Sequence, residues 1–226
     1  QKLDDEDEIV DLTLKYGEAF PISYSSRYKA KHSVFDIYKI EEALETDKLQ
    51  LDLYLDEDHN GGQLRLKVYA PGNPIVLSDV MPILAHMGVR AISELPFEIT
   101  PEGEERSIWI HDFHLELEGQ DSLPEIKDIK EKFETAFAKI WYGEMDSDEL
   151  NTLVLTAAMD WEEVIVLRTY VRYLKQIKYP FGRLFVEKTL TQHAKIAGLL
   201  VGLFKVLLDP KNKDNDSLAY EAAIEV

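Results

Sequence analysis

The order of secondary-structure signals between residues 49 and 117 constrains the fold of this chain more than any other feature. Strictly alternating apolar residues predict half-buried strands at 49–55 and 63–69, and Asn60-Gly61-Gly62 between them is typical of a hairpin turn. A Pro/Gly break at 71–74 precedes a predicted helix at 77–87, with Ser78 as its N-cap and Gly88 as its C-cap. Two further strands are predicted at 89–99 and 107–117, joined by a turn.

The second half of the chain changes character. After Pro124, apolar residues recur every three or four positions, which predicts helices through residue 208. Strands first and helices after predict an α+β protein, and the order strand, helix, strand, strand is the front half of a ferredoxin-like module. We therefore expect an antiparallel sheet with packed helices, followed by an all-α helical lobe. The expected divisions are an acidic and connecting segment at 1–48, the α+β domain at 49–122, the helical domain at 123–209 and a linker at 210–226. Within the first of these, 20–31 is predicted as a connector and 35–44 as a short helix.

Composition narrows the classes of partner. The chain has 226 residues, a net charge of −18 and no cysteine. An acidic surface repels nucleic acid and anionic membrane, and a cysteine-free chain cannot form disulfides or cysteine zinc sites. The apolar stretch 196–208 is too short to span a bilayer. With an acidic start and no signal peptide, we expect a cytoplasmic protein, and the initial Gln1 suggests a fragment of a longer one.

The residues that could bind a metal ion or a nucleotide have simpler structural explanations. His111 and His114 stand three apart on a predicted strand and so point to opposite faces, which argues against a shared metal ion. We expect His111 to be packed and hydrogen-bonded, and Asp112 and His114 to be solvated. The glycines form no GxG pair or Walker loop, so no nucleotide cradle is predicted here.

Two acidic clusters and one glycine pair also have structural interpretations. The loop 56–59 lacks EF-hand spacing and is interpreted as part of the hairpin. Glu144, Asp146, Asp148 and Glu149, with Ser147, are interpreted as helix-capping residues rather than an acid–base pair. The spacing of Gly198 and Gly202 predicts close helix packing. No catalytic, cofactor-binding or metal-binding residue is predicted in this chain.

Longer motifs carry a family resemblance. The segments KVYAPGNPIVLSDVMPILAHMGVRAISELPFEI and IWIHDFHLEL, and later FETAFAKIWYGEMDSDELNTLVLTAAMDWEEV and HAKIAGLLVGLFKVLLDP, resemble the large-type bacterial NAD-specific glutamate dehydrogenases over roughly residues 20–210. The resemblance implies a non-catalytic ACT-like and helical segment that precedes the catalytic domain. The parent would oxidise L-glutamate to 2-oxoglutarate and ammonia with NAD.

The same resemblance implies a role and partners. We expect a regulatory or assembly segment that contacts its own catalytic domain, forms a homo-oligomer and takes an amino-acid effector. The alternative is a purely structural spacer that binds no small molecule. In ACT-like modules, an amino acid sits beside the loop between the first strand and the first helix, which here places the candidate site at Pro71, Gly72, Asn73 and Ser78. A glycine, stiff prolines and a helix N-terminus are compatible with such a site, although a plain rigid turn needs the same residues.

Overall fold

The computed structural model of this chain describes residues 6–56, 63–118 and 125–208. The predicted Asn60-Gly61-Gly62 turn, most of the 56–59 loop and the predicted linker from 210 lie outside the described residues. The chain forms two compact units, one of residues 1–81 with 90–116 and the other of residues 82–89 with 117–226. The four divisions expected from the sequence remain predictions.

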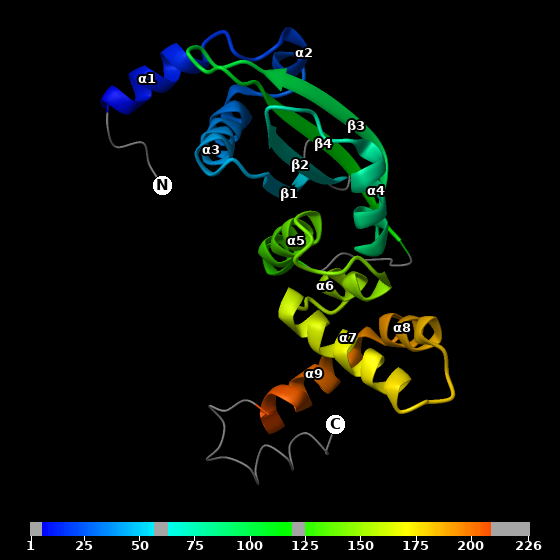
Figure 1. Cartoon of the computed structure of the whole chain (residues 1–226). Coiled ribbons are helices and arrows are strands. Elements are labelled where there is room, and N and C mark those ends of the chain that lie inside the picture. Colours follow the sequence, from blue (N-terminus) through cyan, green and yellow to red (C-terminus); the bar gives the residue numbers. More distant parts are fainter. Residues whose placement is uncertain (1–5, 57–62, 119–124, 209–226) are drawn as a thin grey trace. The chain divides into compact units, whose positions relative to one another are not determined.

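The first unit is built on a four-stranded antiparallel sheet (Figure 1). Its strands are β1 (Gln50–Asp56), β2 (Gln63–Pro71), β3 (Val89–Ile99) and β4 (Ile108–Leu117), in the order β1-β2-β4-β3. In the register, Leu53 lies opposite Leu66, and Leu66 lies opposite Phe113. Because β4 lies between β2 and β3, and helix α4 (Leu77–His86) connects those two strands, the ferredoxin-like α+β prediction is confirmed.

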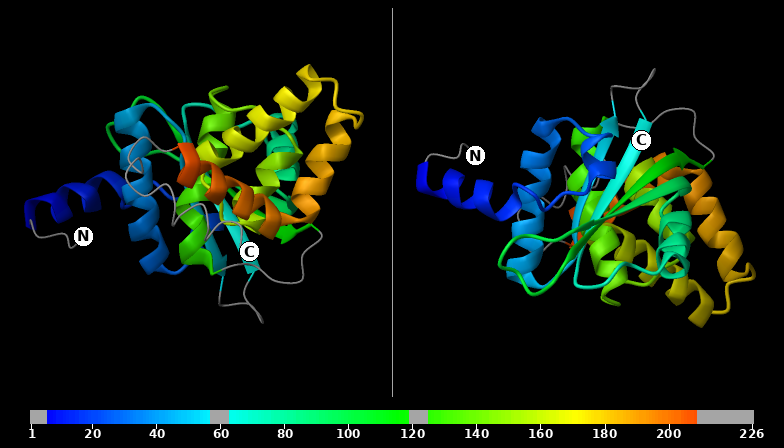
Figure 2. Two further views of the ribbon diagram at one scale, coloured as in Figure 1. Left: turned by 90° about the horizontal axis from the view of Figure 1, so that it is seen from below. Right: turned by 90° about the horizontal axis from the view of Figure 1, so that it is seen from above.

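Three helices precede the sheet: α1 (Glu6–Tyr16), α2 (Ile22–Ser25) and α3 (Ala30–Thr46). The prediction of a plain connector at 20–31 is wrong, because this stretch holds α2 and the start of α3. Helix α3 contacts β1 and β2, and the views in Figure 2 agree that it lies beside these strands. The core of this layer is one cluster of buried residues: Tyr16, Ala19, Tyr24, Ile40, Ala43, Tyr69, Phe97, Ile99, Ile108 and Ile110.

Several polar side chains of β1, β2 and β4 are buried rather than solvated. Asp52 is 7% exposed, β2 is buried along most of its length and Asp112 is fully buried, so the predictions of two half-buried strands and of a solvated Asp112 are wrong. The Lys67 ammonium lies 2.6 Å from Asp36 on α3, and the Arg65 Nη2 lies 2.9 Å from Asp112. These ion pairs allow the face to be covered, because each charge keeps a partner after losing water.

Tyrosine hydroxyls complete the two ion pairs. Tyr24 and Tyr69 donate hydrogen bonds to Asp36, the second of them over 2.7 Å. Tyr28 and Tyr54 donate to Asp112, the latter over 3.0 Å. Burial and the neighbouring carboxylates raise the pKa of all four hydroxyls, so they stay protonated as donors.

The second unit is helical, as predicted for 125–208. Its elements are α5 (Ile126–Trp141), the 3₁₀ helix η1 (Glu149–Thr152), α6 (Leu153–Thr156), α7 (Trp161–Gln176), α8 (Arg183–Gln192) and α9 (Ala194–Leu208). Its core is apolar and includes Ile129, Phe133, Phe137, Leu150, Leu153, Val154 and Val164. Within the described residues, no single helix has the length and apolar character to cross a membrane, whereas α8 and α9, bent by 99° at their junction, pass that test as a pair.

Candidate functional site

The predicted effector loop is a turn between β2 and α4. Gly72 has φ +81°, and a Cβ built there would meet no heavy atom within 4 Å, so the position requires glycine for its backbone and leaves open space beside it. The Gly72 amide donates to the Ser107 carbonyl over 2.8 Å, and the Asn73 amide donates to the Pro71 carbonyl over 3.1 Å. The loop is therefore rigid, and two of its amides are already bonded.

His111 fixes the far end of the same loop. The Ile75 amide donates to His111 Nε2 over 3.1 Å, and Nδ1 lies 2.7 Å from Glu94 Oε1. An amide can only donate, so Nε2 is the acceptor and the Nδ1 hydrogen points to Glu94. Burial lowers the pKa of His111 despite Glu94, which keeps the ring neutral. The packed, hydrogen-bonded role predicted for His111 is confirmed, with its ring 3% exposed.

Ser78 does not cap α4. The helix begins at Leu77, so Ser78 lies inside the first turn, and its hydroxyl makes only a 3.4 Å contact with Asp79. The Asp79 amide donates to the Val76 carbonyl, so the first turn of the helix already includes Ser78. The prediction failed because Ser and Asp are common near helix starts, and the sequence alone does not show which residue begins the helix. Asn73 and Ser78 are exposed, while Pro71 and Gly72 are half-buried. The four predicted residues thus lie along one accessible segment, from the end of β2 to the first turn of α4.

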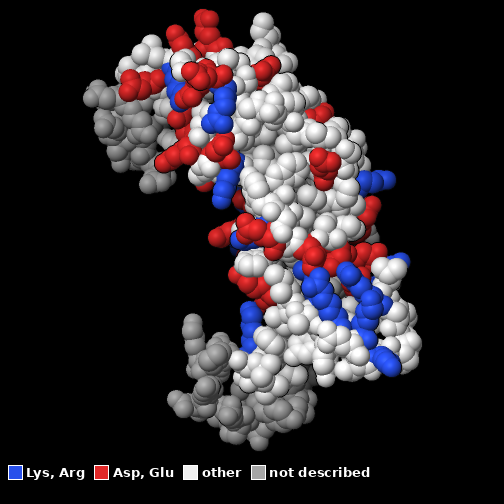
Figure 3. All heavy atoms as spheres, in the orientation of Figure 1, with Lys and Arg blue, Asp and Glu red and all other residues white. Residues whose placement is uncertain are grey.

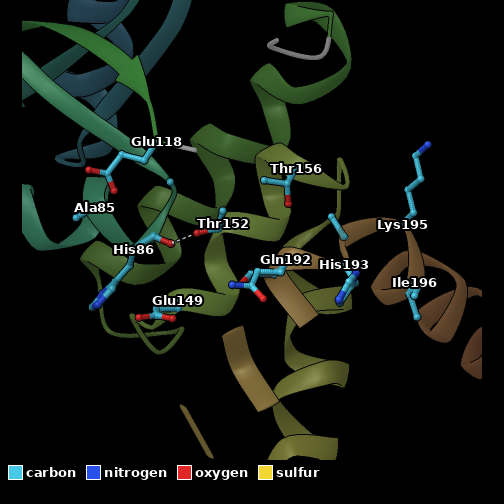
Figure 4. Close-up of a pocket in the computed structure, with 13 residues that line it drawn as sticks. Ala85, His86, Glu118, Glu149, Thr152, Thr156, Gln192, His193, Lys195 and Ile196 are labelled. Atoms are coloured by element: carbon cyan, nitrogen blue, oxygen red, sulfur yellow. Dashed lines mark hydrogen bonds between the residues drawn. The ribbon is translucent and has the colours of Figure 1, made fainter. Parts of the chain in front are cut away.

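A concave site lies within the helical unit (Figure 4). This cavity has a volume of about 1040 Å³ and is bordered by the end of α4, η1, the end of α6 and the α8–α9 junction. Its polar lining includes His86, Glu118, Glu149, Thr152, Thr156, Thr191, Gln192, His193 and Lys195. The sequence did not predict it, because its walls come from segments that are distant along the chain.

Two walls of the cavity are tightly defined. Gly88 ends α4 with φ +81°, as predicted, and a Cβ there would lie 2.8 Å from Thr152 Cγ2. The Thr152 hydroxyl donates to the His86 carbonyl over 3.1 Å, and His86 Nδ1 lies 2.8 Å from the Ser147 hydroxyl. Ser147 therefore holds His86 rather than capping a helix.

The rest of the cavity offers hydrogen-bonding groups. The Thr156 hydroxyl is buried without a hydrogen-bond partner among the described residues, and Figure 4 shows it directed toward the space that Gln192 borders. Hydroxyl, amide and ammonium groups of this kind bind small polar molecules. No group of three or more potential metal ligands occurs in the described part of the chain.

Of the remaining sequence predictions, one is confirmed in part and one is wrong. Asp148 caps η1 by accepting the Leu150 amide over 3.2 Å, which confirms the capping interpretation for this residue, and it also binds the buried Arg168 guanidinium over 2.7 Å. For Glu144 and Asp146 the interpretation is wrong, because they form ion pairs with Lys139 and Arg172 instead. Close packing at Gly198 and Gly202 is not found within the described residues, because a Cβ at either position would meet nothing within 4 Å.

Comparison with known proteins assigns the pieces of this architecture. The family models "Glutamate dehydrogenase, ACT3 domain", "helical motif 2" and "helical motif 3" match residues 48–128, 2–43 and 145–210. The chain is a segment of the large NAD-specific glutamate dehydrogenase family. The ACT3 match contains the sheet and the candidate loop, and the helical motif 3 match contains α7 to α9.

Individual relatives agree with this assignment. The chain is 37% identical over 205 residues to an NAD-specific glutamate dehydrogenase of Halomonas elongata, with 91% of the chain aligned. It is 36% identical over 191 residues, 84% of the chain, to that of Pseudomonas aeruginosa, and 29% identical over 224 residues, 94% of the chain, to that of Mycobacterium tuberculosis. The chain spans only 12% to 14% of the length of these relatives.

Proposed function

We propose that this chain is a regulatory segment of an NAD-dependent glutamate dehydrogenase, and that its ACT3-matched unit binds a small amino-acid effector at the loop of Pro71, Gly72, Asn73 and Ser78. The parent would convert L-glutamate and NAD to 2-oxoglutarate, ammonia and NADH in the cytoplasm, as a homo-oligomer. The segment would act on its own catalytic domain and hold no cofactor itself. The relatives are NAD-specific glutamate dehydrogenases, which supports this activity and cofactor for the parent.

The open backbone at Gly72 carries the effector proposal. A ligand can approach this residue without a side chain in its way, and the bonds of Gly72, Asn73 and Ile75 hold the loop in one shape before binding. A rigid loop loses little conformational entropy when a ligand binds. The exposed start of α4 next to it places amides where a carboxylate could accept hydrogen bonds.

A calorimetric titration of the chain with each protein amino acid tests the proposal. Gly72→Val should abolish binding, and Gly103→Val is the matched control, because Gly103 has φ +82° and equally open surroundings. Binding at one hundred times Kd should stabilise the native chain by about 2.7 kcal/mol. Equal losses in both variants would mean that strain, not the loop, removes binding.

The cavity of the helical unit is the second place where an effector could bind, favoured by the unpartnered Thr156 hydroxyl. Thr156→Val and Gln192→Ala should leave binding unchanged if the loop is the site. If these variants lose binding and Gly72→Val keeps it, the effector binds in the cavity and not at the loop. A chain that binds no amino acid at all would support the structural spacer instead.

A further inference from the structure

His111 of β4 connects β3 to the candidate loop through both of its ring nitrogens. Nε2 accepts the Ile75 amide over 3.1 Å, and the Nδ1 hydrogen is directed to Glu94 Oε1 over 2.7 Å. Trp109 and Phe113 flank the ring on the same face of β4, with ring centroids 6.2 Å and 6.4 Å away. These contacts fix the ring in one tautomer and one orientation.

The hydrogen bond to His111 orders the second half of the loop. The first half is held by backbone hydrogen bonds of the Gly72 and Asn73 amides. Pro74 has no N–H, so the next amide along the chain is that of Ile75, and its acceptor is a side chain instead of a carbonyl. The shape of the loop before α4 therefore depends on a ring nitrogen that is able to accept.

A proton on Nε2 would remove this bond. An imidazolium donates through both nitrogens, so the Ile75 amide would face a second donor 3.1 Å away. The segment that leads into α4 would then lose its anchor to the sheet. The contact with Glu94 would remain, because Nδ1 carries a hydrogen in both states. Protonation of His111 thus acts on the loop and leaves the contact between the two strands in place.

We propose that His111 is a positioning residue of the effector loop, and that amino-acid binding at this loop requires its neutral ring. The neutral ring holds Ile75 and the start of α4 in the shape that binds, and the protonated ring releases them. This role presupposes the effector loop proposed above and names the side chain that sets its shape. A proton and an amino acid then oppose each other's binding, because each favours a different state of the loop.

The surroundings of the ring determine when the proton binds. Burial lowers the pKa of His111, and Glu94 on β3 opposes that shift. Val68, which lies opposite His111 on β2, is uncharged, and Asp112 pairs with Arg65 on the other face of the sheet. Figure 3 shows a largely uncharged surface over β3 and α4. The other charged residues of β3 and of the start of α4 are exposed: Arg90, Glu98 and Asp79.

Amide hydrogen exchange of Ile75, followed by NMR on the 226-residue chain without any amino acid, tests the positioning role. Ring ¹⁵N shifts in the same samples report when His111 takes up its proton. Below the folded pKa of His111, the protection factor of the Ile75 amide should fall by up to about tenfold per pH unit. Protection that persists after the ring is protonated would overturn the proposal, as would a ring that stays neutral at every pH at which the chain is folded.

Substitutions make the test sharper. His111→Gln keeps an acceptor that does not titrate, so the Ile75 amide should stay protected at every pH. His111→Phe keeps an aromatic ring without an acceptor, so protection should already be lost at neutral pH, and a protected Ile75 amide in this variant would overturn the proposal. Glu94→Gln can still accept the Nδ1 hydrogen but lacks the negative charge, so the loss should move to lower pH. Glu98→Gln, on an exposed residue of the same strand, is the matched control and should behave like the unmodified chain.

Calorimetric titration with each protein amino acid connects the ring to binding. An amino acid that binds the unmodified chain at about pH 7.5 should bind more weakly at about pH 5, and His111→Gln should bind it equally at both. Binding that does not change with pH while Ile75 loses its protection would overturn the proposal. A chain that binds no amino acid at any pH would refute the effector loop, whereas the exchange of Ile75 still decides whether His111 holds the loop. Circular dichroism verifies that each variant is folded.

Discussion

At the scale of single residues, the first unit is distinguished by charges that are buried in pairs. Asp36 and Lys67 are 1% and 4% exposed at their side chains, and the Lys67 ammonium also lies 4.3 Å from the centre of the Tyr28 ring. Such a pair contributes little net stability compared with apolar residues, but losing one member leaves the other charge buried alone. The ion pairs therefore fix how α3 lies on the sheet.

Asp36→Ala is expected to destabilise the chain by about 3–5 kcal/mol, because it leaves the Lys67 ammonium without its carboxylate. The double variant Asp36→Ala with Lys67→Met should lose less than the sum of the two single changes. Urea unfolding of the four proteins measures the coupling. Strict additivity would show that the two side chains do not stabilise each other.

His111 should make stability depend on pH. Burial lowers its folded pKa below the ordinary 6.5, so the unfolded chain takes up the proton first as the pH falls. The stability held by the neutral ring is thus fully present above pH 6.5 and is lost at lower pH. Unfolding at pH 7, 6 and 5 should show a smaller loss in His111→Gln, whose amide oxygen can still accept the Ile75 amide. The exposed His193→Gln should behave like the unmodified chain, and an unchanged slope in His111→Gln would contradict the assignment.

At the scale of elements, α4 depends on how it ends. Its last turn closes through the Met87 and Gly88 amides, which donate to the Ile83 and Ala85 carbonyls. Gly88 then reverses the chain into β3 with a left-handed backbone. Thr152 of η1 packs against this residue and bonds the carbonyl of His86, so one glycine joins a helix end to the neighbouring 3₁₀ helix.

Gly88→Ala is expected to cost more than Gly103→Ala. Both positions have φ above +80°, and the left-handed backbone costs alanine about 1–2 kcal/mol. At Gly88 the new methyl would also lie 2.8 Å from Thr152 Cγ2, which adds a steric cost absent at Gly103. Thr152→Ser keeps the hydroxyl and removes that methyl, so it should recover part of the loss in a thermal unfolding measurement. No recovery would mean that the backbone alone sets the cost.

At the scale of the whole molecule, the sheet unit and the helical unit carry different surfaces. The chain is strongly acidic, yet its last three described helices are basic and apolar. Surfaces that carry the same sign of charge repel each other. An acidic surface and a basic, apolar surface can instead attract each other. This contrast in charge supports the proposal that the segment takes part in assembly or regulation.

The chain by itself is expected to have no glutamate dehydrogenase activity. The family models that match it are an ACT domain and two helical motifs, and they leave no catalytic group to carry over. A spectrophotometric assay with L-glutamate and NAD should show no turnover, with a relative's full-length enzyme as the positive control. Turnover on the order of 10 per second would contradict the prediction.

The sequence by itself determined the elements whose causes are local. Alternation located β1 and β2, the three-to-four spacing located the helices after Pro124, and Gly88 marked the end of α4. These signals act through neighbours a few residues apart, so the predicted positions are confirmed, although the half-burial predicted for the two strands is not. The rigid loop at Gly72 was also located in this way, although its ligand stays a proposal.

Tertiary structure alone decided which polar residues are buried. Asp112 alternates with apolar residues on its strand and so gave the pattern of a solvated position, but Tyr28, 84 residues earlier, binds it. The cavity beside Gly88 and the apolar groove between α7, α8 and α9 have the same origin, because their walls meet only after folding. A side chain becomes buried when residues that are distant in sequence pack against it. The free energy of a charge or an apolar side chain depends on these contacts rather than on its neighbours in sequence.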